Sequence, residues 1–471
     1  MLGASGALTL VTVAGLASGL AREWLLVAQW GAGARTDAFL IALFLPEAVR
    51  MMIGGGLLSS AAMAQWQGLS LDERPRRLSQ LTFGLLLIGA MAAAAAFAFR
   101  TPLMHVIGPG LDTTHLLTAA DAFGILAWTL PLFILQGWWS VPMHAEGRYI
   151  AAGLASLAYN LPAVACLAWL GPDATEVAVS WSFVGGSALA ALLLWPAMRG
   201  IGLPLAHLRW SGEAMRQLGR QVTPLLGSAL LGQGVTLLER VVASYLGDGV
   251  ITLLNLARKL ANLPLVALTA VCQVVLGLMA RGGQTERLGL LRQGLAATTV
   301  ITTPASLGLL LSAPAIVALL FPGVTGTERL APLLGWYAAA LVIAGWNALL
   351  ARYCHAQGDT RLPFVCDLFG SGAHALAMPL LAWGFGLMGL AAATLVGVSV
   401  TCALLLHLNG LWRQVHLARI VLSAALPLTL GGLLLHSLPV EPWWRLALST
   451  LAGAVCLALV GLSLKPWRPA A

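Results

Sequence analysis

Hydrophobic positions in this chain occur in long, almost uninterrupted blocks. Apolar runs of about 20 residues recur from end to end, and each is long enough to cross a hydrocarbon layer about 30 Å thick as an α-helix. Glycine, proline and clusters of charge separate the runs. We therefore predict fourteen helical spans, at residues 5–30, 38–64, 79–99, 115–141, 149–170, 176–198, 220–246, 250–280, 290–312, 330–352, 362–383, 387–408, 418–436 and 443–464.

The composition supports membrane insertion and excludes an ordinary soluble enzyme. Of the 471 residues, 59% are hydrophobic and only 9% are charged, whereas soluble domains carry roughly 25% charged residues. The formal net charge is +8, but the basic residues are scattered over short loops and form no nucleic-acid-binding patch. Orientation in the membrane explains them better, so we expect no nucleic-acid partner.

The distribution of basic residues tests the fourteen-span prediction independently, because a missed helix would mix the two sides of the membrane. One side of the predicted topology collects 17 Lys and Arg residues, and the other side has four. The positive-inside rule makes the basic side cytoplasmic. Because the number of spans is even, we expect both termini on that side.

The longest predicted cytoplasmic connection divides the chain into six spans and eight. We expect an all-α integral membrane protein of about fourteen transmembrane helices, in two pseudo-symmetric lobes around a central cavity. A faint repeat supports two lobes: Glu23 and Glu239 each stand eight residues before a Gly-x-Gly pair. The predicted parts are an N-lobe at 1–198, a basic linker at 199–220, a C-lobe at 221–408 and two additional C-terminal helices at 409–471.

Charged residues inside the predicted spans are the strongest functional signal. A charge near the bilayer centre costs at least about 2.5–3.5 kcal/mol, and such residues usually face a protein interior or a hydrated cavity. The basic ones belong to the leading helix pairs of the two lobes, which predicts a cavity for an anionic headgroup, since arginine presents a planar fork that matches phosphate oxygens. The basic residues are Arg22, Arg50, Arg240, Arg258 and Lys259, and the carboxylates beside them are Glu23, Asp37, Glu47 and Glu239.

Structural alternatives remain open for these charges. Arg22 and Glu23 would also fit a membrane interface, with their polar ends extended into the headgroup region. The i,i+3 spacing of Glu47 and Arg50 fits a simple intrahelical pair, and Glu239 with Arg240 fits a structural pair that ties helices together. Two further carboxylates, Asp121 and Asp367, have no counterpart in the repeat, and we expect them at an interface or paired with neighbouring helices.

Several kinds of chemistry have no sequence support. The six cysteines stand singly and the nine histidines are dispersed, so no metal site is predicted. Neither of the two lysines, Lys259 and Lys465, belongs to a phosphate-binding loop that would hydrolyse ATP. We expect a transporter and not an enzyme, without a cofactor, driven by a monovalent-ion gradient, the membrane potential or the substrate's own gradient.

Three motifs resemble the MurJ/MviN family of lipid II flippases, within the multidrug/oligosaccharidyl-lipid/polysaccharide exporter superfamily. "WGAGARTDAFLIALFLPEAVR" is similar to the family's first helical hairpin, "LNLARKLANLP" to its eighth span, and "AQGDTRLP" to its cytoplasmic connection between spans ten and eleven. The resemblance covers the whole chain, including the two additional C-terminal helices. It implies that Arg22, Arg50 and Arg258 contact the pyrophosphate of a lipid-linked substrate. Glu23, Asp37, Glu239, Arg240 and Lys259 are then expected as cavity or gating residues.

The sequence also departs from the family pattern. Leu16, Met51 and Phe44 stand where the family has basic residues, and Gly54–Gly56 replaces its "A-E-G". For the sodium site of some members, Glu239 and Thr394 fit the pattern. His374 and Met378 stand where Asn or Asp is expected, which puts sodium coupling in doubt. The cavity is therefore expected to be less cationic than the family standard.

The resemblance predicts a flippase in the bacterial inner membrane. Its substrate would be an undecaprenyl-pyrophosphate-linked saccharide, with lipid II favoured and an exopolysaccharide or O-antigen repeat as the alternative. A cation-coupled drug antiporter is disfavoured, because its cavity should be dominated by carboxylates. A third alternative is a non-transporting partner of a polysaccharide synthase. Membrane lipids are expected partners, and contacts with cell-wall or polysaccharide synthases are compatible with this prediction.

Overall fold

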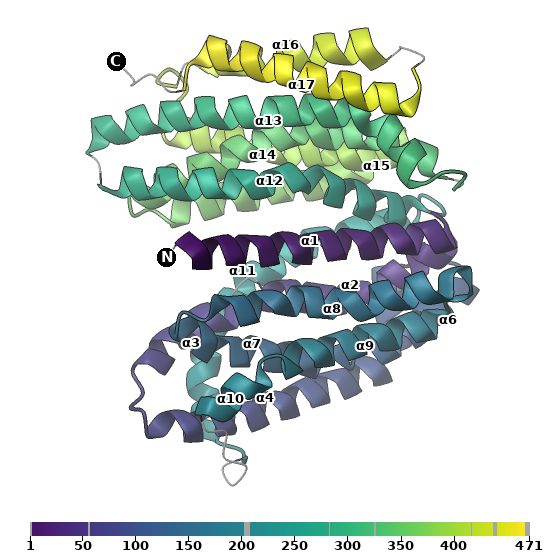
Figure 1. Cartoon of the computed structure of the whole chain (residues 1–471), viewed down its shortest axis with the longest axis vertical. Coiled ribbons are helices and arrows are strands. Elements are labelled where there is room, and N and C mark those ends of the chain that lie inside the picture. Colours follow the sequence, from purple (N-terminus) through teal and green to yellow (C-terminus); the bar gives the residue numbers. More distant parts are fainter. Residues whose placement is uncertain are drawn as a thin grey trace. The chain divides into compact units, whose positions relative to one another are not determined.

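The computed structural model describes residues 2–54, 57–201, 208–281, 283–324, 326–415, 417–436 and 440–466. Every regular element in this part of the chain is helical. By packing, the chain divides into two compact units, residues 1–249 and residues 250–471. Each unit is described by itself below (Figure 1).

The first unit contains eleven described α-helices. They are α1 (Leu2–Trp30), α2 (Ala34–Gly54), α3 (Leu57–Gln67), α4 (Glu73–Ala98), α5 (Arg100–Ile107), α6 (Thr113–Leu126), α7 (Thr129–Ala145), α8 (Tyr149–Leu170), α9 (Glu176–Leu192), α10 (Trp195–Ile201) and α11 (Gly212–Ser244). Helix α1 packs along α8, α8 along α9, α2 against α6 and α7, and α4 against α7. Among the described residues, Trp66, Leu78, Leu81 and Trp138 form the centre of a buried cluster that joins α3, α4 and α7.

The second unit contains six described α-helices. They are α12 (Val250–Arg281), α13 (Gln284–Leu320), α14 (Leu330–Ala356), α15 (Arg361–Leu408), α16 (Leu417–His436) and α17 (Pro442–Leu464). Helix α13 lies between α14 and α17, and α14 also packs against α12 and α15. The buried side chains include Trp346, whose indole N–H donates to the Thr299 hydroxyl over 2.9 Å.

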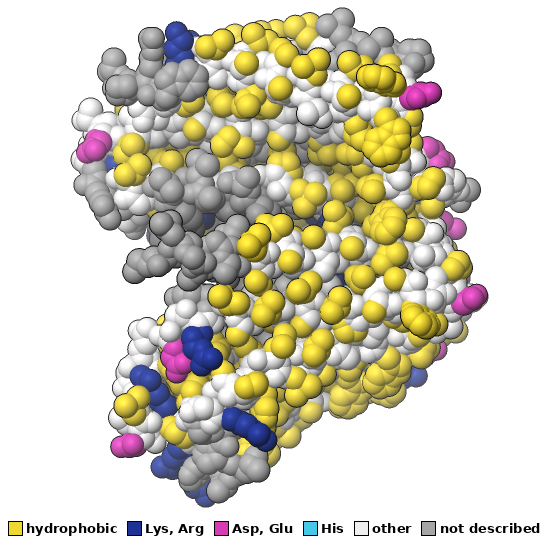
Figure 2. All heavy atoms as spheres, viewed as in Figure 1, with side chains coloured by type: hydrophobic (Ala, Val, Ile, Leu, Met, Phe, Trp, Pro, Cys, Tyr) yellow, Lys and Arg dark blue, Asp and Glu magenta, His cyan; other side chains and the backbone are white. Residues whose placement is uncertain are grey.

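The membrane character of the fold is confirmed. Ten helices in the described part of the chain are long and apolar enough to cross a bilayer. A helix satisfies its backbone hydrogen bonds internally, which the hydrocarbon layer requires. In Figure 2, hydrophobic side chains cover the flanks of the first-unit helices, and Lys and Arg gather at the end that holds α10 and the start of α4. The total of fourteen crossings stays a prediction.

Several predicted spans are interrupted in the structure. The span predicted at 115–141 is divided between α6 and α7, and the span at 176–198 between α9 and α10. In the opposite direction, α15 has 48 residues and joins two predicted spans, with a break at Gly386, whose φ is 55°. Helix α5 was not predicted. Hydropathy detects apolar length, but it does not detect the break at Gly386, which uses a left-handed backbone that glycine tolerates.

The division into units also bears on the predicted lobes. Helix α11, which the sequence analysis placed in the second lobe, packs against α2, α3, α4 and α5 of the first unit. At its end, the Ser244 hydroxyl accepts the backbone N–H of Gly110 over 3.0 Å. A Cβ on Gly110 would lie 2.2 Å from the Ser244 carbonyl oxygen, so this close approach requires glycine. Part of the predicted 199–220 linker, residues 202–207, lies outside the described residues, and the lobe boundaries stay predictions.

Candidate substrate-binding site

The candidate site begins where α1 and α8 approach each other closely. A Cβ on Gly15 of α1 would lie 3.1 Å from the Cβ of Ser156 of α8, so the glycine allows this approach. The contact brings the Asn160 side chain of α8 beside α1. The Asn160 amide donates to the Ser156 carbonyl oxygen over 3.0 Å and to the Ser18 hydroxyl over 3.3 Å. These bonds aim the Asn160 carbonyl oxygen at the next residue of the site, Arg22.

Arg22 is a buried cation held by named partners. Its guanidinium donates to Asn160 Oδ1 over 2.8 Å and to Glu23 Oε1 over 2.6 Å. It lies 4.9 Å from the ring centroid of Phe183 and 5.7 Å from that of Tyr159. Arg22 is only 2% exposed and Glu23 only 3%. The interfacial alternative for these two residues is therefore wrong, because neither polar end extends to the protein surface.

Glu47 and Arg50 of α2 form the second half of the cluster. Arg50 donates to Glu47 through two nitrogens, Nη2 over 2.7 Å and Nε over 3.3 Å. The intrahelical-pair alternative is confirmed as geometry, but the pair also has partners on other helices. The Tyr159 hydroxyl of α8 donates to Glu47 Oε2 over 3.0 Å, and Arg22 Nη2 lies 3.8 Å from Glu47 Oε1. Two arginines and two glutamates thus meet in one cluster whose charges sum to zero.

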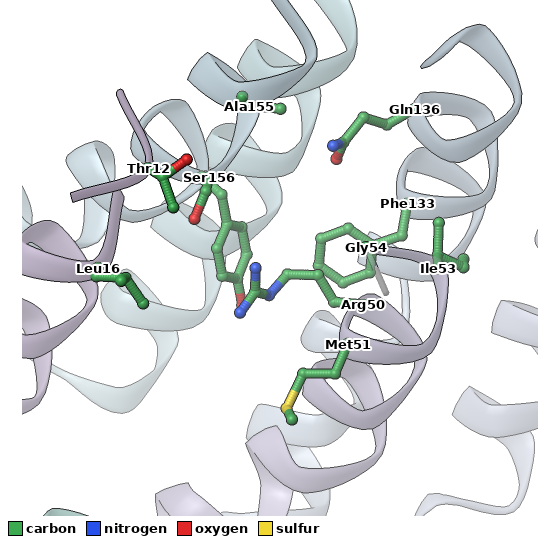
Figure 3. Close-up of a pocket in the computed structure, with 12 residues that line it drawn as sticks. Thr12, Leu16, Arg50, Met51, Ile53, Gly54, Phe133, Gln136, Ala155 and Ser156 are labelled. Carbon is green, nitrogen blue, oxygen red and sulfur yellow. The ribbon is translucent and has the colours of Figure 1, made fainter. Parts of the chain in front are cut away.

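A cavity of about 420 Å³ lies beside Arg50, between α1, α2, α7 and α8. Figure 3 shows the Arg50 side chain extending from α2 toward Ser156, with Gln136 and Met51 to either side. Among the described residues that line the cavity, Arg50 alone carries a charge. The others are Thr12, Leu16, Met51, Ile53, Gly54, Phe133, Gln136, Gly153, Ala155, Ser156 and Tyr159.

Two of the cavity-lining residues explain the reduced charge of this cavity. Leu16 and Met51 stand where the family resemblance predicts arginine, and both line the cavity wall. Leu16 is 42% exposed and Met51 55% exposed. Of the predicted Gly54–Gly56 departure, Gly54 lines the cavity, and Gly55 and Gly56 lie outside the described residues. Two of the three positions that lack the expected basic residue therefore line this cavity, Leu16 from α1 and Met51 from α2.

Asp37 lies at the other end of α2, where the two Gly-x-Gly turns meet. Asp37 is 2% exposed, and its Oδ2 accepts the backbone N–H of Gly249 over 2.7 Å. Gly249 has a φ of 82°, and a Cβ there would lie 2.4 Å from the Ala32 carbonyl oxygen. The position therefore requires glycine for both conformation and space. The matching turns, which the sequence analysis treated only as a repeat, are in direct contact.

Arg240 and Glu239 bring α11 to the same helix. Arg240 donates to the Leu40 carbonyl oxygen of α2 over 3.1 Å, and its guanidinium lies 4.9 Å from the ring centroid of Phe44. Arg240 thus ties α11 to α2, whereas the predicted pairing of Glu239 with Arg240 stays a prediction. It also places a cation at Phe44, where the resemblance predicts a basic residue. Glu239 is 5% exposed and interacts within the protein.

The second unit holds the remaining predicted residues. Arg258 and Lys259 of α12 are half-buried, and both interact within the protein. The Thr394 hydroxyl lies 3.3 Å from His374 Nε2 on the same helix, α15. Asp367 is exposed, and in the first unit Asp121 is exposed and lies 3.7 Å from Arg100 Nε. Among the described residues, no group of three or more His, Cys, Asp or Glu side chains is placed to hold a metal ion.

Sequence reasoning missed the neutral members of the cluster. Tyr159 and Asn160 stand together in a mostly apolar helix, and each is 3% exposed or less. Adjacent polar residues inside a predicted span, Tyr-Asn at 159–160, were a usable signal. Their partners could not be named from sequence, because the hydrogen bonds join α8 to α1 and α2.

A family model described as "Lipid II flippase MurJ" matches residues 26–460 of this chain. The probable lipid II flippase MurJ of Thermotoga maritima is 27% identical over 393 residues, which cover 80% of this chain and 79% of that protein. The corresponding protein of Rhizobium meliloti is 26% identical over 420 residues, 84% of this chain and 78% of that one. The lipid II flippase MurJ of Burkholderia cenocepacia is 23% identical over 345 residues, 66% of this chain and 65% of that one.

Solved structures share the fold. A structure described as lipid II flippase MurJ in an inward closed conformation superimposes with a TM-score of 0.83 at 19% identity, over 98% of each chain. An inward-facing multidrug resistance transporter of the MATE family, in the MOP superfamily, gives a TM-score of 0.69 at 13% identity, over 86% of this chain and 94% of that one. At such identities the structural matches show the architecture alone. The family match rests on the sequence.

Proposed function

The chain belongs to the MurJ family of lipid II flippases, and on this premise we propose that it carries lipid II across the bacterial inner membrane. Lipid II is an undecaprenyl-pyrophosphate-linked saccharide whose headgroup must pass from the cytoplasmic to the outer leaflet. Moving a pyrophosphate and sugars through hydrocarbon is prohibitively costly, because their hydration is lost. A hydrated cavity with fixed cations replaces part of that hydration. The protein's task is transport, and the proposal assigns it no covalent chemistry.

The observation that carries the proposal is the position of Arg50, at the wall of a cavity of about 420 Å³ and backed by the buried Arg22. Guanidinium groups bind phosphate oxygens through parallel hydrogen bonds. Gln136, Thr12 and Ser156 offer neutral donors and acceptors at the same cavity, which suits the saccharide. We assign pyrophosphate binding to Arg22, Arg50 and Arg258.

Alternating access between the two units follows from the same proposal. Arg258 of the second unit is the third proposed pyrophosphate contact, and Glu23, Asp37, Glu239, Arg240 and Lys259 would serve as cavity or gating residues. The bond between Asp37 and the Gly249 N–H supports a gating role, because it joins α2 to the turn that precedes α12. Opening such a gate would require water or another donor to replace the Gly249 N–H at Asp37, because an unsatisfied buried carboxylate is costly.

We propose the orientation that the positive-inside rule predicts, with both termini cytoplasmic. Exposed tryptophans support the ends of two predicted spans, because tryptophan is enriched at both membrane–water interfaces. Trp169 and Trp383 are 89% and 95% exposed, and both lie at ends of predicted spans that the topology assigns to the outer side. Membrane lipids are therefore partners along the helix flanks. Contacts with cell-wall synthases are compatible with the proposal but have no structural support.

The energy source is proposed to be the membrane potential or a monovalent ion. A cavity that carries net charge responds to the potential by about 2.3 kcal/mol per charge per 100 mV. Glu239 and Thr394 are the candidate ion ligands. The Thr394 hydroxyl is 3.3 Å from His374 Nε2, so the position is polar, but a histidine is a poor sodium ligand. Transport that persists after sodium is replaced by choline would exclude sodium as the coupling ion.

Complementation tests the proposed function. A bacterial strain depleted of its own lipid II flippase is expected to grow when this protein is expressed. Growth is expected to be lost in Arg22→Ala, Arg50→Ala and Arg258→Ala, because each removes a proposed pyrophosphate contact. Arg216→Ala is the matched control, since Arg216 is exposed and pairs with Glu213 outside the predicted span.

Two results would contradict the proposal. If the wild-type protein is well expressed and inserted in the membrane but does not restore growth, its substrate would be another lipid-linked saccharide. Rescue that survives all three arginine substitutions would remove the arginines from the mechanism. Membrane levels of every variant, measured by immunoblotting, separate loss of function from loss of protein.

A further inference from the structure

Glu47 occupies the space between the two arginines of the cluster. Its Oε1 lies 2.7 Å from Arg50 Nη2 and 3.8 Å from Arg22 Nη2. Its Oε2 lies 3.3 Å from Arg50 Nε and accepts the Tyr159 hydroxyl over 3.0 Å. The side chain is 19% exposed, beside a cavity lined by Arg50. One carboxylate therefore contacts both cations, and two of its partners, Arg50 and Tyr159, line the cavity.

This arrangement occupies one bidentate edge of Arg50, the edge formed by Nε and Nη2. The Nε and Nη2 donors form the planar fork that matches two oxygens of a phosphate. Glu47 already uses both donors. A phosphate that binds Arg50 in this bidentate manner must displace the Glu47 carboxylate. The two anions compete for the same pair of hydrogen-bond donors.

The charges around Glu47 make it unfavourable for its carboxylate to stay ionised once the diphosphate has displaced it. The charged groups around Glu47 are Arg50 on its own helix and Arg22 on α1, with Glu23 beyond Arg22, and the titratable Tyr159 faces it from α8. The two arginines and two glutamates sum to zero. A diphosphate diester adds two negative charges, which would leave an ionised Glu47 next to like charge in a partly buried site. Taking up one proton removes that repulsion.

We propose that Glu47 is a displaceable counter-ion, which leaves Arg50 when the substrate's diphosphate binds and takes up one proton from the cavity water. The inference rests on the proposed function and extends it to a proton-linked binding step. In this step the Glu47 carboxylate becomes a carboxylic acid, the Arg50 fork transfers from carboxylate to phosphate, and no covalent bond to the substrate changes. The carbonyl oxygen of the acid still accepts the Tyr159 hydroxyl.

Calorimetry on the purified full-length protein in lipid nanodiscs tests this proposal. The first probe is a lipid II analogue with a farnesyl chain, and the second is a farnesyl-diphosphate-linked N-acetylhexosamine. In both, the diphosphate is a diester without a group that titrates near neutral pH. Titrations in buffers of different ionisation enthalpy count the protons that accompany binding. Dissociation constants are measured from pH 6 to pH 8.

For the wild type, we expect uptake of one proton per ligand at the alkaline end of this range. By linkage, the dissociation constant then falls about tenfold for each unit by which the pH is lowered. Glu47→Gln keeps the size of the side chain and an acceptor for Tyr159 but carries no charge. We expect it to bind without proton uptake, at least about tenfold more tightly than the wild type at pH 8. Its affinity should be independent of pH.

Glu213→Gln is the matched control. Glu213 also pairs with an arginine three residues later, with 2.6 Å between Arg216 Nη2 and Glu213 Oε2, but both side chains are more than half exposed. This variant should retain the proton uptake and the pH dependence of the wild type. An infrared difference spectrum adds a direct readout, because ligand binding should produce a protonated-carboxyl band that Glu47→Gln lacks.

Wild-type binding without proton uptake, or uptake that persists in Glu47→Gln, would overturn the role of Glu47. The number of protons that the wild type takes up tests the proposal even if Glu47→Gln fails to fold. The proposed function fails separately. Binding of the N-acetylhexosamine probe without binding of the lipid II analogue would reject lipid II as the substrate and still test Glu47. If neither probe binds at any pH, both proposals fall.

Discussion

Two glutamate–arginine pairs in the first unit have the same local geometry and different surroundings. Glu47 with Arg50 and Glu213 with Arg216 are both i,i+3 pairs, with shortest N–O distances of 2.7 and 2.6 Å. The side chains of the first pair are 19% and 26% exposed, and those of the second are 56% and 61% exposed. The first pair also contacts Arg22 and Tyr159 from other helices. The second begins α11, near the basic linker.

The difference shows how little the local pair decides by itself. An exposed i,i+3 pair contributes a few tenths of a kcal/mol and is weakened by salt. A pair enclosed by other helices is fixed by their side chains, and removing one partner leaves charge in a site that water reaches poorly. The spacing is the same, but the enclosed pair includes Arg50, which lines a cavity.

The largest expected effect comes from removing Arg22, the buried cation beside the Glu47–Arg50 pair. Arg22→Ala removes the buried cation that pairs with Glu23 and leaves Glu47 with Arg50 alone, and should lower the free energy of unfolding by about 3–5 kcal/mol. Arg216→Ala should change it by less than about 0.5 kcal/mol. Chemical unfolding in one detergent compares the two. Adding Glu47→Gln to Arg22→Ala should restore part of the loss, and equal effects of the two arginine substitutions would contradict the comparison.

A double-mutant cycle compares the pairs directly. For Glu47→Gln and Arg50→Gln, we expect a coupling free energy on the order of 1–3 kcal/mol, because the residues share a network. For Glu213→Gln and Arg216→Gln, we expect a clearly smaller coupling, because both side chains are more than half exposed. The coupling of the second pair should also fall with added salt. Similar couplings in both cycles would mean that burial does not distinguish the pairs.

A smaller effect should follow from removing one hydrogen bond to the enclosed pair. Tyr159→Phe deletes the hydroxyl that donates to Glu47, and should lower the free energy of unfolding by about 1.5 kcal/mol, as for a hydrogen bond to a charged group. Tyr245→Phe is the matched control, since Tyr245 is 67% exposed, and should have almost no effect. Thermal unfolding of both variants in the same lipid measures this difference. If Tyr159→Phe is as stable as the wild type, the hydroxyl does not help to hold Glu47.

The smallest effect belongs to the exposed pair and depends on pH. A hydrogen bond from the Gln217 amide and the charge of Arg216 hold the pKa of the Glu213 carboxyl below its usual value. A carboxyl with a lowered pKa in the folded state contributes stability above its unfolded pKa of about 4.3, and loses it as the pH falls through the folded value. Unfolding temperatures of wild type and Glu213→Gln should therefore differ slightly near pH 6 and converge in acid. A difference in unfolding temperature that grows as the pH falls would contradict a lowered pKa of Glu213 in the folded state.

The charged members of the site could be predicted from sequence. Arg22, Glu23, Glu47 and Arg50 stand out because charges are rare in apolar spans, and the spacing of Glu47 and Arg50 places them on one helix face. Tyr159 could not be assigned as a partner of Glu47, because 112 residues separate them in the chain. The bond from Gly249 to Asp37 was equally hidden, because it uses a backbone N–H that every residue except proline carries.

By itself, the sequence determined that the chain is a bundle of membrane helices and that a few ionic residues lie inside it. Both follow from local physics, since apolar length fixes a helix in lipid and a charge placed there requires a partner. Only the tertiary structure decided which partners those charges have. The approach of α1 to α8 at Gly15, and the resulting position of Tyr159 and Asn160 beside the arginines, depend on side chains from separate helices fitting together. The spacing along one helix does not specify that fit.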